Sequence, residues 1–189
     1  MRVAFKEWAI VVQALGQGEQ TVILRKGGIH EGAPGFQVKH REFFLFPTFF
    51  HQQEAGVVRS AQGRLAPLLK KREGQATIPL EYWAKVEEVF IVRNDEALAS
   101  LRPYHIWSDE TISDKFEWGK EKALTILLLR VFRLRKIFEL PDQAGYAGCK
   151  SWIQTTMDVA VSESEPVLTD REFTERSEAI RHVLEAPYV

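Results

Sequence analysis

The sequence contains one cysteine, Cys149, in 189 residues, so an internal disulfide is excluded and a reducing compartment is expected. No apolar run reaches the roughly 18 residues that a membrane span requires. The longest extends from Ala123 to Leu129. The first residues do not resemble a secretory leader, because Lys6 and Glu7 interrupt them and no small-residue cleavage site follows. We therefore expect a cytoplasmic protein with no membrane partner.

A strong net charge is also missing. Lys and Arg number 25 against 26 Asp and Glu, which leaves −1 and no global field to attract nucleic acid. The charges are unevenly placed, because residues 1–150 hold 22 basic and 18 acidic side chains whereas the last 39 hold 3 and 8. The acidic end is either a solvated helix or a tail that covers a basic groove.

Motifs of metal and cofactor sites are absent as well. The chain has no HExxH, CxxC or HxH pattern for a metal, and no GxGxxG or Walker A pattern for a nucleotide. His30, His40 and His51 have no spacing that demands a metal. A nucleophile elbow is excluded because Trp152 stands where GxSxG needs glycine. We expect no cofactor and no metal site.

Helices are predicted from apolar spacing and capping residues. Phe5, Trp8, Val12 and Leu15 recur at helical spacing, which predicts an opening helix. Residues 49–71 are expected to be partly helical. Three more helices are expected over 95–101, 109–118 and 169–186, beginning at Asn94, at Ser108 and at a Thr169–Glu172 capping box.

Strands are predicted at apolar and β-branched runs, namely 20–26, 36–40, 42–46, 82–93, 124–137 and 150–155. The run 124–137 begins apolar on both faces, so it should be central in its sheet. Helices and strands interleave without a βαβ rhythm, which favours an α+β fold with a mixed or mostly antiparallel curled sheet, flanking helices and a C-terminal helix. We expect one domain over 1–158, a linker over 159–168, and a helix over 169–186 packed on or beside the domain.

Two segments in the first third of the chain could bind a ligand. Arg25, Lys26, Gly27 and Gly28 place two cations before a bare turn, which can hold an anion or can be a hairpin with surface charges. Farther along the chain, polar side chains lie among aromatic rings. This arrangement could bind a nucleobase or another flat polar ligand, or it could be a corner of the core in which the polar groups are hydrogen-bonded. These polar residues are Thr48, His51 and Gln52.

Two further segments complete the candidates. Arg130 shares a strand face with large apolar residues and must pair with a carboxylate or an anionic ligand, while Arg133 lies on the opposite face. Ser151 and Trp152 bring a hydroxyl and a large ring next to Cys149, which is either a small buried hydrophobe or a thiol paired with a histidine. His40 is a second candidate general base beside His51.

Several of these segments also match a known pattern, and the chain resembles the uncharacterised prokaryotic family known as domain of unknown function 1802. The resemblance extends to about Thr155 and implies no established activity. It rests on Lys6-Glu7-Trp8-Ala9, Ala14-Leu15, Leu24 to Ile29 with Glu31, Phe43, Leu45 to Thr48, His51-Gln52, His105-Ile106-Trp107, Leu129-Arg130-Val131, Tyr146 and Gly148 to Trp152.

A fainter likeness concerns ASCH domains, which share a β-barrel with the RNA-binding PUA domains and carry a G-x-K-x-x-E-x-R pattern after an opening helix. Gly18 and Arg25 match that pattern, whereas Gln20 replaces the lysine and Ile23 the glutamate. The resemblance implies a PUA-like barrel as the leading fold, and the two replacements argue against ASCH-type catalysis.

Three functions remain open at this stage. The first is a nucleic-acid or nucleotide binding module of PUA-like type, with RNA, DNA or a nucleotide as partner. The second is a hydrolase or nuclease-like enzyme on the same class of ligand, with a histidine base and arginines that stabilise an anion. The third is a protein-interaction module. The first two require the candidate residues to line one shared hollow.

Overall fold

The computed structural model describes residues 1–26, 36–50, 52–119, 121–148, 150–156 and 158–186. Short 3-10 turns are labelled η. The elements follow the chain as β1 (Val3–Trp8), α1 (Ala9–Gly16), β2 (Val22–Arg25), β3 (Glu42–Thr48), η1 (Glu54–Gly56), α2 (Arg59–Arg72), β4 (Thr77–Val92), α3 (Asp95–Ser100), η2 (Arg102–Tyr104), α4 (Asp109–Glu117), β5 (Leu124–Pro141), η3 (Ala144–Tyr146), β6 (Trp152–Gln154), β7 (Glu165–Pro166) and α5 (Asp170–Glu185).

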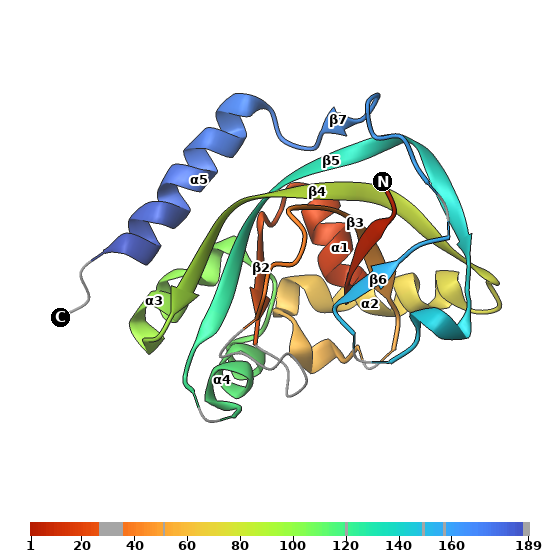
Figure 1. Cartoon of the computed structure of the whole chain (residues 1–189). Helices are drawn as coiled ribbons and strands as arrows, with labels where there is room; N and C mark the ends of the chain where they lie inside the picture. The colour runs from red at the N-terminus through yellow and green to blue at the C-terminus, as the bar shows by residue number, and fades with distance from the viewer. Residues whose placement is uncertain (27–35, 51, 120, 149, 157, 187–189) are drawn as a thin grey trace.

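A seven-stranded sheet organises the described part of the chain. Its order is β2-β5-β4-β3-β1-β6, with β7 attached to β5 (Figure 1). The β1–β3 pair is parallel, and the other pairs are antiparallel. The predicted α+β class with a mostly antiparallel sheet is therefore confirmed.

Two long strands give the sheet its curl. β4 has 16 residues and β5 has 18, and they pair from Thr77–Pro141 to Val92–Leu124. Their register shifts twice, between Leu80 and Tyr82 and between Val86 and Glu88. Bulges of this kind bend a strand and increase its twist, and Figure 1 shows both strands arching over the rest of the fold. β5 lies between β2 and β4, which confirms its predicted central place.

The curl brings β2 close to β1 without pairing their backbones. A closed barrel would join its two edges by a hydrogen-bonded ladder, whereas the described strands form an open path from β2 to β6. Across the seam, the Arg25 guanidinium at the end of β2 donates a hydrogen bond to the carbonyl of Lys6 in β1. The described sheet is thus open, and the Arg25 side chain links β2 to β1, a strand that pairs with β3 and β6 and not with β2.

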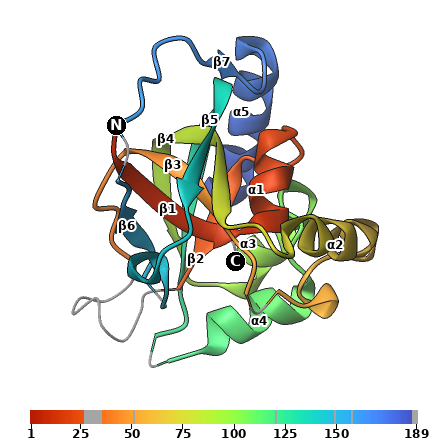
Figure 2. The same cartoon turned by 90° about the vertical axis from the view of Figure 1, so that its right-hand side faces the viewer.

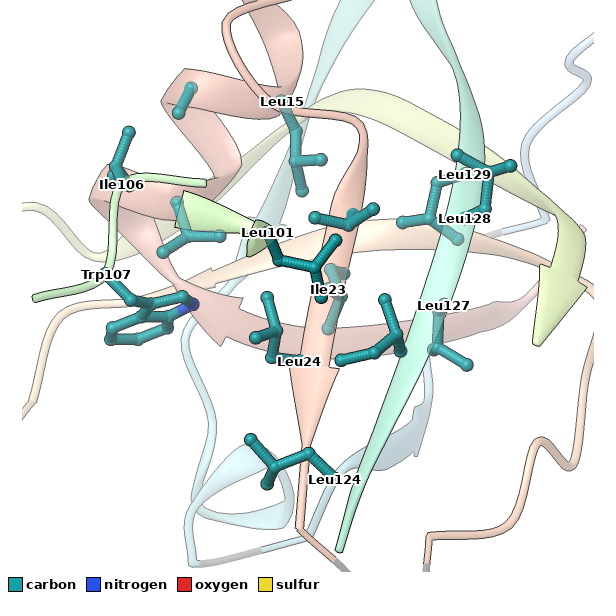
Figure 3. Close-up of a cluster of buried hydrophobic side chains, with 14 of the residues drawn as sticks. Leu15, Ile23, Leu24, Leu101, Ile106, Trp107, Leu124, Leu127, Leu128 and Leu129 are labelled. Atoms are coloured by element: carbon teal, nitrogen blue, oxygen red, sulfur yellow. The ribbon is translucent and has the colours of Figure 1, made fainter. Parts of the chain in front are cut away.

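The core lies on both faces of the sheet. Successive side chains of a strand point to opposite faces, so Phe43 and Leu45 of β3 enter the larger cluster while Phe44 and Phe46 enter the smaller one. This explains the unbroken apolar run of β3. In the larger cluster, α1, β2, β5 and the segment before α4 meet, as Figure 3 shows for Leu15, Ile23, Leu24, Leu127 and Trp107 among other side chains.

The start of the chain differs from the prediction. The helix predicted from Phe5 is wrong, because residues Val3–Trp8 form β1 and α1 begins only at Ala9. β1 is paired on both edges, with β3 on one side and β6 on the other (Figure 2). Tertiary pairing overrides the helical spacing of two aromatic residues. Residues 36–40, predicted as a strand, contain no strand either, although Phe36 is buried in the core.

The predicted linker lies on the sheet, and the C-terminal helix packs beside it. The Val159 N–H bonds the carbonyl of Met1, and strand β7 pairs with β5. α5 begins with the predicted capping box, in which Thr169 and Glu172 satisfy each other's backbone N–H groups. Figure 1 shows α5 alongside the outer part of β4 and β5. Ile180 on its inner face is fully buried.

Candidate functional site

The predicted site residues do not all gather in one place. Gly27, Gly28 and His51 lie outside the described residues, as does Cys149. The other nine fall into three neighbourhoods: Arg130 and Arg133 on β5, His40 with Ser151 and Trp152 near β6, and Arg25 with Lys26, Thr48 and Gln52 near the ends of β2 and β3.

The two β5 arginines have structural partners of their own. Arg130 is 7% exposed, donates to Asp170 Oδ1 at 2.7 Å and to the Thr169 carbonyl at 3.2 Å, and stacks over the ring of Phe173. Arg133 donates to the carbonyl of Gly16 at 3.1 Å. On β5, Arg130 is five residues from Thr125, the partner of Arg25, which is about 17 Å along a strand. The structure thus separates these arginines from Arg25.

His40, Ser151 and Trp152 belong to an aromatic cluster at the β1–β6 edge. The Trp152 ring packs edge-on against Phe5 and Phe43 and lies 5.3 Å from the ring of His40. The carbonyl of Ser151 accepts the N–H of Lys6 at 2.9 Å. These contacts fasten β6 to β1, so in the described residues this neighbourhood is a packing corner.

Thr48 and Gln52 hold the junction between β1 and α1. Thr48 Oγ1 donates to the carbonyl of Glu7 at 3.0 Å. Gln52 Nε2 donates to the Thr48 carbonyl at 2.7 Å, and its Oε1 accepts the N–H of Ile10 at 3.3 Å. Ile10 lies in the first turn of α1, whose N–H groups lack partners within the helix. The amide predicted to face a ligand instead completes this helix end.

Arg25 meets a buried carboxylate across the seam. Glu7 is 4% exposed, and its Oε2 lies 3.5 Å from Arg25 Nη2 while its Oε1 accepts the N–H of Trp8. The Arg25 guanidinium also lies 4.4 Å from the centre of the Phe5 ring. Two polar atoms here, Glu7 Oε2 and Arg25 Nε, are buried and make no hydrogen bond within the described chain. Unpartnered buried polar atoms are rare and costly, so this pair is incompletely satisfied.

A second cation, Lys115 of α4, completes the group. Its Nζ lies 3.5 Å from the centre of the Trp107 ring. Burial lowers the pKa of Lys115 to about 8, Arg25 adds to that shift, and the Glu7 carboxylate opposes it. The three charges are therefore within electrostatic reach of one another. We call Glu7, Arg25 and Lys115 the charged cluster.

Tryptophan rings form the wall behind the charged cluster. Trp107 is 1% exposed, and its ring centre lies 4.8 Å from that of Trp8. The Trp107 Nε1–H makes no hydrogen bond within the described residues. Indole nitrogens usually find a partner when buried, so Trp107 adds a third unsatisfied polar atom to the two of Glu7 and Arg25.

Lys26, next to Arg25, has a structural role. Its Nζ donates to the carbonyl of Phe116 at 2.8 Å and to that of Glu121. Burial lowers the pKa of Lys26, while Glu117 and Glu121 oppose that shift. A cation at the carboxyl end of a helix satisfies free carbonyls and the helix dipole. Lys26 therefore anchors the end of α4 and so helps to position Lys115.

Sequence reasoning did not single out Glu7, Lys115 or Trp107 as site residues. One usable signal was the apolar stripe of α4, in which Ile112 and Phe116 are buried and Lys115 shares their side of the helix. A lysine on a core-facing stripe indicates either a snorkelling side chain or a buried charge. Glu7 carried no such signal, because its burial depends on the strand state of β1, which the sequence did not predict.

Two other features are absent from the part of the chain that the structure describes. No group of three or more histidine, cysteine, aspartate or glutamate side chains gathers there in an arrangement that could hold a metal ion. None of the helices in the same residues combines the length and the apolar character needed to cross a bilayer.

These features define an α+β domain with an open curled sheet and a buried charged cluster at its seam. The family model for domain of unknown function DUF1802 matches residues 4–179, and the chain belongs to this family. No curated protein matches the sequence.

Among solved structures, the chain is similar to ASCH from Zymomonas mobilis, with 12% identity, 93% of each chain covered and a TM-score of 0.44. It is also similar to two single-substitution variants of that protein. One has 13% identity, a TM-score of 0.42, and 93% of this chain and 94% of that chain covered. The other has 14% identity, a TM-score of 0.44, and 93% and 96% covered.

Proposed function

We propose that the charged cluster binds a phosphate group of a nucleotide or nucleic acid. The observation that carries the proposal is the surplus of positive charge: Arg25 lies 3.5 Å from the Glu7 carboxylate, and Lys115, the second cation, is within electrostatic reach of that same carboxylate. Removing a charge from water is expensive unless it is paired, and a phosphate would supply the missing negative charge. Arginine and lysine are also the side chains that bind phosphate most strongly.

Exposed aromatic side chains on the segments that follow Thr48 and Lys115 support a ligand that carries bases. Phe50 follows β3 two residues after Thr48 and is 77% exposed, and Trp118 follows α4 three residues after Lys115 and is 48% exposed. Bases stack on such rings with about 1–3 kcal/mol each. The net charge of −1 argues against nonspecific binding of a long duplex, so a mononucleotide or a single strand is the favoured ligand.

Intrinsic tryptophan fluorescence tests the proposal, because Trp8 and Trp107 lie beside the charged cluster. The chain would be titrated at low salt with inorganic phosphate, a mononucleotide, and single-stranded and duplex RNA and DNA. Lys115→Met and Arg25→Met should each weaken binding about tenfold or more, the loss of one charge-assisted hydrogen bond. Lys122→Met is the matched control, because Lys122 is an exposed cation paired with Glu117. No binding of any ligand, or equal binding by all variants, contradicts the proposal.

A second candidate function is hydrolysis of a nucleotide or nucleic acid, and the lowered pKa of Lys115 favours it. At a pKa of about 8, a sizeable fraction of the amine is neutral near physiological pH and can accept a proton from water. Arg25 would stabilise negative charge on the phosphoryl oxygens. His40, a base predicted from sequence, instead packs against Trp152.

Hydrolysis is tested by following a labelled single strand and a mononucleotide across pH 6 to 10. If Lys115 is the base, the rate rises through about pH 8 and then levels, because the neutral amine is the active form. Lys115→Arg keeps the charge and removes the base, so it should retain binding and lose turnover. Turnover that survives in Lys115→Arg rules out this role.

A further inference from the structure

One stretch of β4 has a free edge. β3 pairs with β4 at Trp83, Ala84 and Lys85, and the Val86 N–H bonds the carbonyl of Arg41. Beyond that point Glu87 lies at a bulge, residues 88–92 pair with β5 on one side, and no described strand lies on the other. Unprotected edges of this kind are sites where another strand can add to a sheet.

The backbone direction along this edge follows from the neighbouring ladder. The Leu129 N–H bonds the carbonyl of Thr21, so Leu129 points towards β2. Backbone polar groups alternate in direction along an antiparallel strand, so the even-numbered residues of β5 point towards β4. They pair with Glu88, Phe90 and Val92. Val89 and Ile91 therefore direct their N–H and C=O groups away from β5, towards the free edge.

The same two residues expose apolar side chains. Val89 is 39% exposed and Ile91 55% exposed. An open hollow of about 420 Å³ is lined by the consecutive residues 89–94 together with Ala97 and Leu184. Because side chains of a strand alternate between faces, a hollow lined by consecutive residues runs along the strand edge. The edge thus combines backbone groups that no described strand pairs, apolar surface and space.

We propose that this edge pairs with the same edge of a second copy of the chain, antiparallel and centred on Phe90. A two-fold interface presents the same patch twice, so the patch must complement itself. In this register, the outward residues Val89 and Ile91 face Ile91 and Val89 of the second copy. Glu87, whose carboxylate lies 3.2 Å from Lys85 Nζ in its own chain, faces Arg93 of the second copy, and this contact occurs twice. Opposite charges and apolar pairs across strands are stabilising.

Neighbouring registers are less favourable. Centring on Val89 would place Lys85, whose edge β3 already occupies, opposite Arg93, and centring on Ile91 would place Glu87 opposite Asp95, the first residue of α3, so neither register matches the free length of the edge. If one copy shifts by a single residue, residues whose N–H and C=O groups point towards the interface lie opposite residues whose groups point away from it. The two strands then cannot form a hydrogen-bonded ladder. The free length of the edge, together with the Glu87–Arg93 contacts, therefore selects a second copy and one register for it.

Size-exclusion chromatography with light scattering, over a series of protein concentrations, tests the proposal. The parent chain should show a concentration-dependent dimer mass, and Ile91→Lys should give a monomer at every concentration. Glu87→Arg and Arg93→Glu should each shift the midpoint of dimer formation about tenfold or more upwards, and the double swap should restore it. Ile137→Lys, at an exposed apolar residue elsewhere on β5, is the control and should leave the dimer intact.

Three results would overturn the proposal. The first is a monomeric parent chain throughout the series. The second is a dimer that Ile91→Lys leaves unchanged, because another surface would then form it. The third is a monomer whose edge binds a synthetic extended peptide of alternating apolar residues, because the occupant would then be a different partner. Circular dichroism of Ile91→Lys shows whether that variant is folded, and the charge swaps provide a test that does not alter the apolar surface.

Discussion

Arg25 of β2 and Glu7 of β1 face each other across the open seam of the sheet, with Nη2 and Oε2 3.5 Å apart. The Glu7 side chain is 3% exposed and the Arg25 side chain 23%, so the carboxylate lies inside and the guanidinium reaches the surface. The contact places a charged cluster in an otherwise apolar region, between two strands that do not pair with each other.

Lys115 should make stability depend on alkaline pH. Its pKa falls from an ordinary 10.5 to about 8 on folding, so between these values the unfolded chain binds more protons and stability rises with pH. Below pH 8, the buried charge costs on the order of 2–3 kcal/mol once partial solvent screening is discounted. Lys115→Met should therefore be more stable than the parent at pH 7, and the difference should shrink towards pH 10.

Urea denaturation of both proteins at pH 7, 8, 9 and 10 measures that difference. The two proteins share all other lysines and tyrosines, so the titration of those groups cancels in the difference between their free energies of unfolding. Lys122→Met serves again as the exposed control and should track the parent at every pH. A gap between Lys115→Met and the parent that stays constant with pH would show that the Lys115 amine titrates normally in the folded chain.

His105 should limit stability in acid. Burial lowers its pKa from 6.5 to about 4. Between these pH values the histidine is protonated in the unfolded chain and neutral in the folded one, so the free energy of unfolding falls as the pH drops from 6.5 to 4. The full effect is about 3 kcal/mol. Both ring nitrogens lack a hydrogen-bond partner within the described residues, so His105→Phe should remove the acid loss at little cost. The measurement is the midpoint of acid unfolding, with exposed His182→Gln as the comparison, and equal midpoints for His105→Phe and the parent exclude the effect.

Arg130 should hold α5 through its guanidinium rather than through its ion pair alone. The Arg130 side chain is 8% exposed while that of Asp170 is fully exposed. Asp170→Asn should therefore cost less than about 1 kcal/mol, the usual size of an exposed pair. Arg130→Met also loses the hydrogen bond to Thr169 and the contact with Phe173, and should cost about 2–3 kcal/mol.

Hydrogen exchange of residues 170–185 reads out that difference directly. Arg130→Met should accelerate exchange in α5 while β4 and β5 remain protected, because the helix can detach locally. The contrary result is similar exchange in Arg130→Met and Asp170→Asn, which would mean that the helix depends on its apolar face alone.

Much of the fold could be predicted from residue patterns. The caps at Asn94 and Ser108 and the Thr169–Glu172 box begin α3, α4 and α5 as predicted, because capping is a local interaction. The apolar run of β5 indicated its central place, since both faces are covered. β1 was missed because its strand state depends on β3 and β6, which lie at least 30 residues away along the chain.

The candidate site could be predicted only in part. Arg25 was singled out by its place at the end of a strand, but its partner Glu7 is set by the curl of the sheet, which no local pattern encodes. Arg130 was recognised as a buried cation that needs a partner, and the structure supplies Asp170. Which carboxylate each arginine meets is decided by long-range packing, because Glu7 reaches Arg25 through the curl of the sheet and Asp170 reaches Arg130 through the docking of α5.

The pKa of Lys115 in the presence and absence of ligand tests the central claim most directly. Reductive methylation with ¹³C-formaldehyde gives each lysine an NMR signal, and Lys115→Arg assigns the relevant one. The proposed site predicts a pKa of about 8 for the free chain and a clear rise when a mononucleotide is bound, because the phosphate favours the charged amine. A Lys115 signal whose pKa is unmoved by a saturating nucleotide, while Lys122 behaves in the same way, would contradict phosphate binding at the charged cluster.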